Sequence, residues 1–335
     1  MTPVADPAAD YFQAIQTFDP YRATNVVLEL LDQATPMQNI TEEVLAPAQV
    51  RVGHLWESGV WSVADEHAAT SITEGALATL THAARRRPDA GARHVAVACV
   101  EGEWHSLPAR MIAAVTEATG RAKVTILGPS LPAEQLHRRL AAGDIDLVAL
   151  SCTMPTNLIG AAHCIAAAHD VNVPVIVGGR AFGANPLRAR AIGADGWTED
   201  ARALLGTIPP MARRELTIPA EALFLNALDE DTLTSAYQRL AQAIPMLRDM
   251  PYPQQAGAKE GLRWLGRFSA NALLTHDATI LEDALLWCAR LLQGKMPPEA
   301  VTTCAQILAE TVASQCSEGA AMLRDSAATV GAKLH

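Results

Sequence analysis

Five short apolar runs alternate with helical stretches between residues 93 and 206, and this alternation restricts the possible folds more than any other feature of the chain. The first four runs are rich in Val, Ile, Leu and Ala, which is typical of strands buried on both faces of a parallel sheet, and the fifth, Gly196-Trp197, is weaker. Because a helical pattern follows each run, we expect five βα units and hence a doubly wound, Rossmann-like sheet. The expected strands cover residues 94–100, 123–127, 146–152, 173–177 and 196–197, and the expected helices cover residues 106–119, 132–142, 157–169, 185–192 and 200–204.

The segments on either side of this region carry helical patterns throughout. Ser62 is followed three residues later by Asp65, which is close to a capping box at the start of a helix. The predicted fold class is therefore multidomain, α and α/β. It comprises a helical bundle (1–90), a Rossmann-like domain with a five-stranded parallel sheet (91–207) and an all-helical domain (215–335), globin-like in its helix count. The expected flanking helices cover residues 11–16, 21–33, 41–56, 63–85, 221–228, 232–247, 256–274, 278–292 and 298–324.

Composition excludes several classes of protein. The net charge is −10, and the one compact basic cluster, Arg85-Arg86-Arg87, is interpreted as a solvated linker because no basic recognition helix accompanies it. Direct DNA binding is therefore not expected. No apolar run approaches the roughly 20 residues of a membrane span, and the N-terminus lacks a signal segment, so we expect a cytoplasmic protein without a membrane partner. The six cysteines form no Cys-x-x-Cys and are expected to be reduced thiols.

Polar and small residues follow three of the predicted strands. Glu103 and His105 come after the first strand, Ser151 and Thr153 end the third, and Gly178-Gly179 follows the fourth. Taken singly, a loop histidine is more often solvated and a Gly-Gly pair is usually a turn. Because the carboxyl ends of parallel strands meet at one edge, however, all of them can face one ligand. A histidine with a neighbouring carboxylate suits a metal ligand whose second ring nitrogen is held in place.

The pattern Glu103-x-His105-x-x-Pro108, followed by Ser151-x-Thr153 and Gly178-Gly179, resembles the cobalamin-binding domain of corrinoid proteins. The resemblance implies that His105 is the lower axial ligand of cobalt and that Glu103 supports it. It further implies that Ser151, Thr153 and the two glycines line the pocket for the displaced nucleotide tail. Two positions depart from the family pattern, since Glu103 replaces an aspartate and Pro108 replaces a glycine.

A second motif lies in the predicted bundle. Trp56, nine further residues and Glu66-His67 resemble the light-sensing cobalamin proteins, in which the tryptophan and glutamate cover the upper face of adenosylcobalamin. The alternative is a core tryptophan and a first-turn helix acid favoured by the helix dipole. Glu57 stands where the light-dependent repressors carry a histidine that takes the vacated cobalt position. His54, His67 or water therefore remain the alternatives for that upper ligand.

The C-terminal helical region after a cobalamin photoreceptor resembles the arrangement in photocobilins, which pair cobalamin with a bilin such as biliverdin. Arg263 and Arg267 lie four residues apart on one helix face, as do Trp264 and Phe268, and His276 follows. Together they suit the propionates, pyrrole nitrogens and apolar rings of a bilin. The alternative is that the aromatic residues are ordinary core and the arginines are solvated.

These resemblances predict a light sensor that uses adenosylcobalamin, with biliverdin as a second chromophore. We expect no catalytic turnover of its own, a homo-oligomer whose assembly depends on light, and an effector protein or fused domain that receives the signal. The rival function is a corrinoid methyl carrier of a methyltransferase system. A third alternative is a cobalamin carrier that does not switch.

Overall fold

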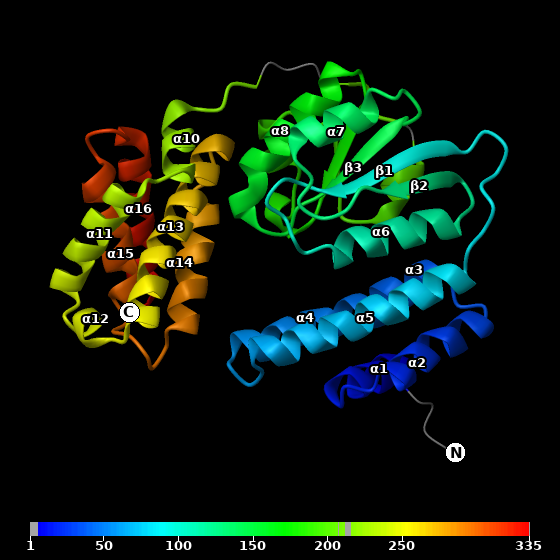
Figure 1. The fold of residues 1–335 in the computed structure, drawn as a ribbon, viewed down its shortest axis with the longest axis horizontal. Coiled ribbons are helices and arrows are strands. Elements are labelled where there is room, and N and C mark those ends of the chain that lie inside the picture. Colours follow the sequence, from blue (N-terminus) through cyan, green and yellow to red (C-terminus); the bar gives the residue numbers. More distant parts are fainter. Residues whose placement is uncertain (1–5, 207, 212–215, 335) are drawn as a thin grey trace. The chain divides into compact units, whose positions relative to one another are not determined.

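The computed structural model describes residues 6–206, 208–211 and 216–334, and it divides the chain into two compact units (Figure 1). The first comprises Met1–Ser151, Ala168–Gly178 and Thr198–Met211, and the second Cys152–Ala167, Gly179–Trp197 and Ala212–His335. The three-domain boundaries expected from the sequence stay a prediction, since this division cuts the chain at the ends of strands.

The first unit begins with a helical bundle whose helices start where polar caps precede proline. Asp6 and Asp19 accept hydrogen bonds from the first turns that they precede, and a proline follows each. At Ser62 the predicted capping box is present, because the side chains of Ser62 and Asp65 each bond the other's backbone amide. The helices are α1 (Pro7–Gln16), α2 (Pro20–Asp32), α3 (Met37–Asn39), the π-helical η1 (Ile40–Leu45), α4 (Ala46–Glu57) and α5 (Val63–Ala83).

The predicted five-stranded sheet is confirmed, with the strand order β2-β1-β3-β4-β5. The pairs of β1 with β2, β1 with β3 and β3 with β4 are parallel, and β1 is buried after its first residue. The strands are β1 (Arg93–Cys99), β2 (Ala122–Ile126), β3 (Leu147–Ser151), β4 (Val175–Gly178) and β5 (Gly196–Thr198). The intervening helices are α6 (Leu107–Ala118), α7 (Ala133–Leu140), η2 (Pro155–Asn157), α8 (Leu158–Asp170), η3 (Arg180–Phe182), α9 (Leu187–Ala191) and η4 (Ala201–Leu205).

Helix α6 joins the bundle to the sheet within the first unit, and Figure 1 shows it between the two layers. Leu107, Met111 and Val115 recur every four residues and pack into the core of the bundle. Ala109 and Ala113 lie on another face and pack against β1. The small alanines allow α6 and β1 to approach closely. Because β1 is buried in the sheet and α6 packs on both the sheet and the bundle, both ends of the loop between them are fixed.

The second unit contains the expected all-helical region, with two corrections. The single helix expected at residues 232–247 is interrupted at Ile244 and Pro245, because proline has no amide hydrogen to continue a helix, so the chain forms α11 (Glu230–Ala243) and α12 (Met246–Asp249) instead. The single helix expected at residues 298–324 is wrong, because the chain forms α15 (Ala300–Val312) and α16 (Ser317–Leu334). The carboxylate of Glu221, on α10, accepts hydrogen bonds from the backbone amides of residues 317, 318 and 319 and so caps a new helix start. The remaining helices are α10 (Ala220–Asn226), α13 (Tyr252–Thr275) and α14 (Thr279–Leu291).

The globin-like interpretation of this region stays a prediction. Within the described ranges, no helix combines the length and the apolar character that crossing a membrane requires.

Candidate functional site

The loop from β1 to α6 carries the strongest candidate residues, and its backbone is fixed by the loop after β2. Gly102, with a φ of +87°, donates its amide hydrogen to the Ser130 hydroxyl at 3.1 Å, and Ser130 donates its own amide to the carbonyl of Glu103 at 2.8 Å. The side chain of Glu103 is fully buried, whereas that of His105 is 60% exposed. The loop therefore keeps the carboxylate inside the protein and presents the imidazole at the surface.

Glu103 orients the His105 ring. Its Oε1 accepts hydrogen bonds from the backbone amide of His105 at 2.9 Å and from Nδ1 at 2.5 Å. The Glu103 hydrogen bond raises the pKa of His105, partial burial opposes this, and the charges of Glu103 and Glu66 add to the rise. With the Nδ1 proton held by a carboxylate, Nε2 is the ring nitrogen left to bind a metal ion.

Among the described residues, no metal centre made by protein side chains alone includes His105. In the described part of the chain, no three His, Cys, Asp or Glu side chains gather in a way that could hold a metal ion. A single exposed imidazole with a buried carboxylate behind it fits a metal whose equatorial ligands come from a macrocycle, as in haem proteins. The donor set thus fits the cobalt of a corrinoid, which His105 would bind.

The predicted tail-pocket residues lie at the carboxyl ends of β3 and β4. Ser151 pairs in register with Cys99 on one side and with Gly178 on the other, so the strand ends form one row. A Cβ at Gly178 would lie 2.8 Å from the carbonyl oxygen of Thr198. The absence of a side chain is therefore required by the neighbouring strand, whether or not a ligand also uses the space.

Two predicted residues follow these strand ends and belong to the second unit. Thr153 is half-buried. Gly179 has a φ of +105°, and a Cβ there would lie only 2.3 Å from the carbonyl oxygen of Cys152. The loops after β3 and β4 thus approach so closely that only glycine fits at position 179. The roles of the four residues in holding a nucleotide tail stay predictions.

The Trp56 and Glu66-His67 motif lies on α4 and α5, which contact each other in the bundle (Figure 1). Trp56 is half-buried near the end of α4, Glu66 is half-buried in the first turn of α5, and His67 is exposed. His67 Nε2 lies 3.5 Å from the Glu66 carboxylate. The charge of Glu66 also contributes to the raised pKa of His105. That this motif and the His105 loop serve one cofactor stays a prediction.

Helix α5 is anchored beside the His105 loop. The Ser106 hydroxyl lies 3.4 Å from the Glu74 carboxylate, at the long limit for a hydrogen bond. Glu74 is eight residues along α5 from Glu66, so the two carboxylates are about 12 Å apart along the helix axis. Glu66 therefore lies on α5 about two helical turns away from the point where the helix meets the loop.

Sequence reasoning missed two features of this site. Trp104, between Glu103 and His105, is 72% exposed, which makes it an apolar surface beside His105. Its position between the two motif residues could have identified Trp104 from the sequence. The second is a set of hydrogen bonds behind Glu66. The Thr70 hydroxyl lies 3.0 Å from the Glu66 carboxylate and 3.1 Å from the Gln49 amide oxygen, and it can donate to one of them at a time. No local pattern could have linked α4 to α5 in this way.

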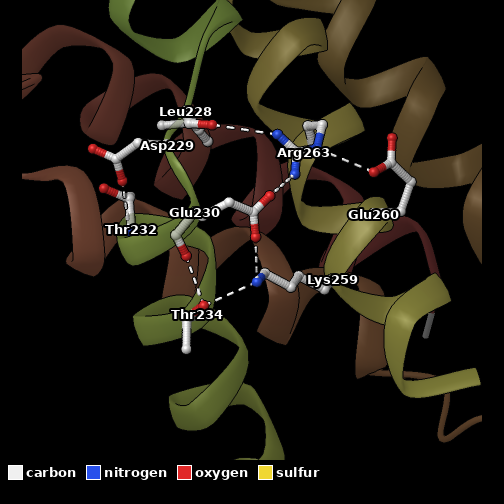
Figure 2. Close-up of polar contacts among 8 residues, drawn as sticks. All are labelled: Leu228, Asp229, Glu230, Thr232, Thr234, Lys259, Glu260 and Arg263. Atoms are coloured by element: carbon white, nitrogen blue, oxygen red, sulfur yellow. Dashed lines mark hydrogen bonds and ion pairs between the residues drawn. The ribbon is translucent and has the colours of Figure 1, made fainter. Parts of the chain in front are cut away.

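The predicted bilin residues are only partly brought together. Figure 2 shows that Arg263 is already engaged, because its guanidinium pairs with Glu230 and Glu260 and donates to the carbonyl of Leu228. Lys259 also pairs with Glu230, so this cluster ties α13 to the start of α11. Arg263 therefore stabilises the helical region and would have to give up these partners to bind a propionate.

Arg267, Trp264 and Phe268 do form a group on α13. The guanidinium carbon of Arg267 lies 5.9 Å from the centroid of the Trp264 ring, and the rings of Trp264 and Phe268 are 6.3 Å apart. His276 is exposed at the left-handed C-cap of α13, about 20 Å along the helix from Arg263. Those two residues are thus not neighbours, and the bilin site stays a prediction.

Comparisons with known proteins address the cofactor directly. Residues 93–205 match the B12 binding domain, and residues 8–81 match a second B12 binding domain family. A relative, the HTH-type transcriptional repressor CarH of Myxococcus xanthus, is 37% identical over 138 residues, which are 41% of this chain and 44% of the relative. The chain therefore spans less than half the length of that curated relative.

Among solved structures, the Methanosarcina barkeri monomethylamine corrinoid protein matches with a TM-score of 0.51 at 20% identity. The match covers 58% of this chain and 95% of that protein, and it supports the fold alone. The two B12 binding domains and the His105 loop agree on the cofactor. The chain is a cobalamin-binding protein with an N-terminal helical B12-binding domain and a Rossmann-like B12-binding domain.

Proposed function

We propose that this chain is a light sensor that uses adenosylcobalamin and has no catalytic turnover of its own. The observation that carries the proposal is that α5, which bears Glu66-His67 and contacts the Trp56 helix α4, reaches the His105 loop, where the Ser106 hydroxyl lies 3.4 Å from the Glu74 carboxylate. In this proposal Glu66 and Trp56 lie over the site, and the chain itself would cover the upper face. A methyl carrier needs that face open to a partner enzyme.

In this proposal His105 binds the cobalt through Nε2, and the buried Glu103 keeps Nδ1 protonated and the ring fixed. Trp56 and Glu66 enclose the upper ligand. The bound cofactor supplies a cobalt–carbon bond that light breaks. Trp56 and Glu66 would then be uncovered, and the packing of α4 and α5 would change. This two-state element would alter the assembly of a homo-oligomer and signal to an effector protein or domain.

The test is to load the purified protein with adenosylcobalamin in the dark and to record its visible spectrum and its mass by light scattering before and after illumination. Light is expected to change both. Protein loaded with hydroxocobalamin, which lacks the photolabile bond, should show no change of mass. An unchanged mass after complete photolysis would contradict the sensor function. Methyl transfer to or from the bound cobalt would support the carrier instead.

Biliverdin is proposed as a second chromophore, bound beside Trp264 and Arg267. The support is the aromatic pair and the half-buried arginine on one stretch of α13. Addition of biliverdin should produce a red absorption band that Arg267→Ala weakens more than Arg263→Ala, since Arg263 is occupied by Glu230 and Glu260. Absence of the band would leave the C-terminal helices as a signalling or dimerisation region.

A further inference from the structure

Asn271, on α13, holds the turn that follows β3. Its side chain is fully buried. Its Oδ1 accepts a hydrogen bond from the backbone amide of Ile159 at 2.8 Å, and its Nδ2 donates to the carbonyls of Thr156 at 3.1 Å and Arg267 at 2.8 Å. Both amide hydrogens are used, so the side chain is locked. A helix of the C-terminal region therefore fixes the backbone of η2 and the start of α8, all within the second unit.

Arg188, on α9, connects the loop after β4 to the C-terminal helices, as Asn271 does for the turn after β3. The side chain is 9% exposed. It donates from Nη1 to the carbonyl of Ala181 at 3.0 Å, from Nε to Asp277 at 2.8 Å and from Nη2 to the Thr279 hydroxyl at 3.0 Å. These charge-assisted bonds tie the turn after Gly179 to the junction of α13 and α14. Both loops are thus supported by the same C-terminal helices.

Thr156 lies in the turn that Asn271 holds, and its hydroxyl has no hydrogen-bond partner within the described residues. The residue is 5% exposed. Leaving a buried hydroxyl without a hydrogen bond destabilises a protein. A bound ligand can supply the hydrogen-bond partner that the protein does not. The turn contacts η3, directly after the Gly178-Gly179 pair. The unpaired hydroxyl therefore lies in the pair of loops that the sequence predicts to hold the nucleotide tail.

We propose that Asn271 is a positioning residue for the nucleotide tail of the bound corrinoid, because it fixes the turn from which the Thr156 hydroxyl bonds that tail. The inference rests on cobalamin binding by this chain and not on its photochemistry. It makes the C-terminal helices part of the means by which the protein recognises a complete cobalamin. By thermodynamic linkage, tail binding would in turn stabilise the packing of α13 against η2.

The test compares hydroxocobalamin with cobinamide, a corrinoid that lacks the nucleotide tail, by equilibrium binding in the dark. Asn271→Leu is expected to weaken hydroxocobalamin binding about tenfold or more and to leave cobinamide binding within about twofold of the native value. Ser269→Ala is the matched control. Ser269 is equally buried on α13, but within the described residues its side chain bonds only its own helix, at Leu265, so both affinities should stay unchanged.

Equal losses for both ligands, or no loss for either, would overturn the proposal. Thr156→Val serves if Asn271→Leu does not fold. Removing an unpaired hydroxyl should leave the melting temperature of the unloaded protein unchanged or higher, yet weaken the binding of hydroxocobalamin and not of cobinamide. A Thr156→Val variant with native affinity for both corrinoids would contradict the role of the hydroxyl. Because light plays no part, failure of the sensor function would leave these outcomes unaffected.

Discussion

Replacing Glu103 by Gln should weaken corrinoid binding while leaving the protein folded. One oxygen of Glu103 accepts both the Nδ1 and the backbone hydrogen bonds of His105, and the residue is fully buried. Glutamine keeps the shape and one acceptor but removes the charge. A hydrogen bond to a charged group contributes about 1.5–3 kcal/mol, which corresponds to a factor of roughly 10–100 in affinity. The usual cost of losing a carboxylate behind a ligating histidine is of the same size.

Equilibrium dialysis with hydroxocobalamin and with cobinamide measures this directly. Because His105 would bind cobalt in either corrinoid, Glu103→Gln should weaken both by the same factor. His105→Ala should weaken both further and change the visible spectrum of the bound corrinoid. Equal melting temperatures of the unloaded proteins exclude misfolding as the cause. If Glu103→Gln binds both corrinoids within about twofold of the native affinity while His105→Ala does not, the carboxylate does not orient the ligand and the reasoning is refuted.

Three further predictions concern the scaffold. Tyr11→Phe should lower the free energy of unfolding by about 1–2 kcal/mol in denaturant titrations, because the buried hydroxyl, whose pKa burial raises to about 12, donates to Thr73. Gly179→Ala should destabilise the protein by more than about 2 kcal/mol or prevent folding, whereas Gly53→Ala, which meets no atom within 4 Å, should be neutral or stabilising. Burial raises the pKa of Glu221, but its backbone amide and thiol partners outweigh this and lower it below 4.5. The ionised Glu221 therefore stabilises the protein fully above about pH 4.5, and this stabilisation is lost as the pH falls below it. In urea titrations, Glu221→Gln should reduce the loss of unfolding free energy between neutral and acid pH.

The sequence predicts what local patterns determine. Apolar periodicity located the five strands and most helices to within a few residues, since buried strands and helices repeat their apolar positions at different intervals. The break between α15 and α16 was missed because the group that caps the new helix is Glu221, almost a hundred residues earlier. The engagement of Arg263 by Glu230 was missed for the same reason. Contacts between elements distant in the chain decide these details.

In the candidate site too, local contacts could be predicted from the sequence and long-range contacts could not. Glu103 and His105 are two residues apart, so their hydrogen bond could be anticipated from the motif. The link of Asn271 to Thr156 spans 115 residues and requires the fold. Sequence motifs therefore predict which groups contact a ligand, whereas the structure identifies the groups that hold those residues in place.

The hydrogen bonds behind Glu66 indicate where a change at the upper face would be felt. Gln49 donates to the Thr73 hydroxyl at 2.7 Å, and Thr73 also accepts the hydrogen bond of the buried Tyr11. Through Thr70, the carboxylate of Glu66 is thus connected to α4 and to the centre of the bundle. The Thr70 hydroxyl has one hydrogen for two acceptors, so a shift of Glu66 would redirect that bond toward Gln49. On the proposed function, loss of the upper ligand would therefore be transmitted into the packing of α1, α4 and α5, the elements whose rearrangement the assembly measurement detects.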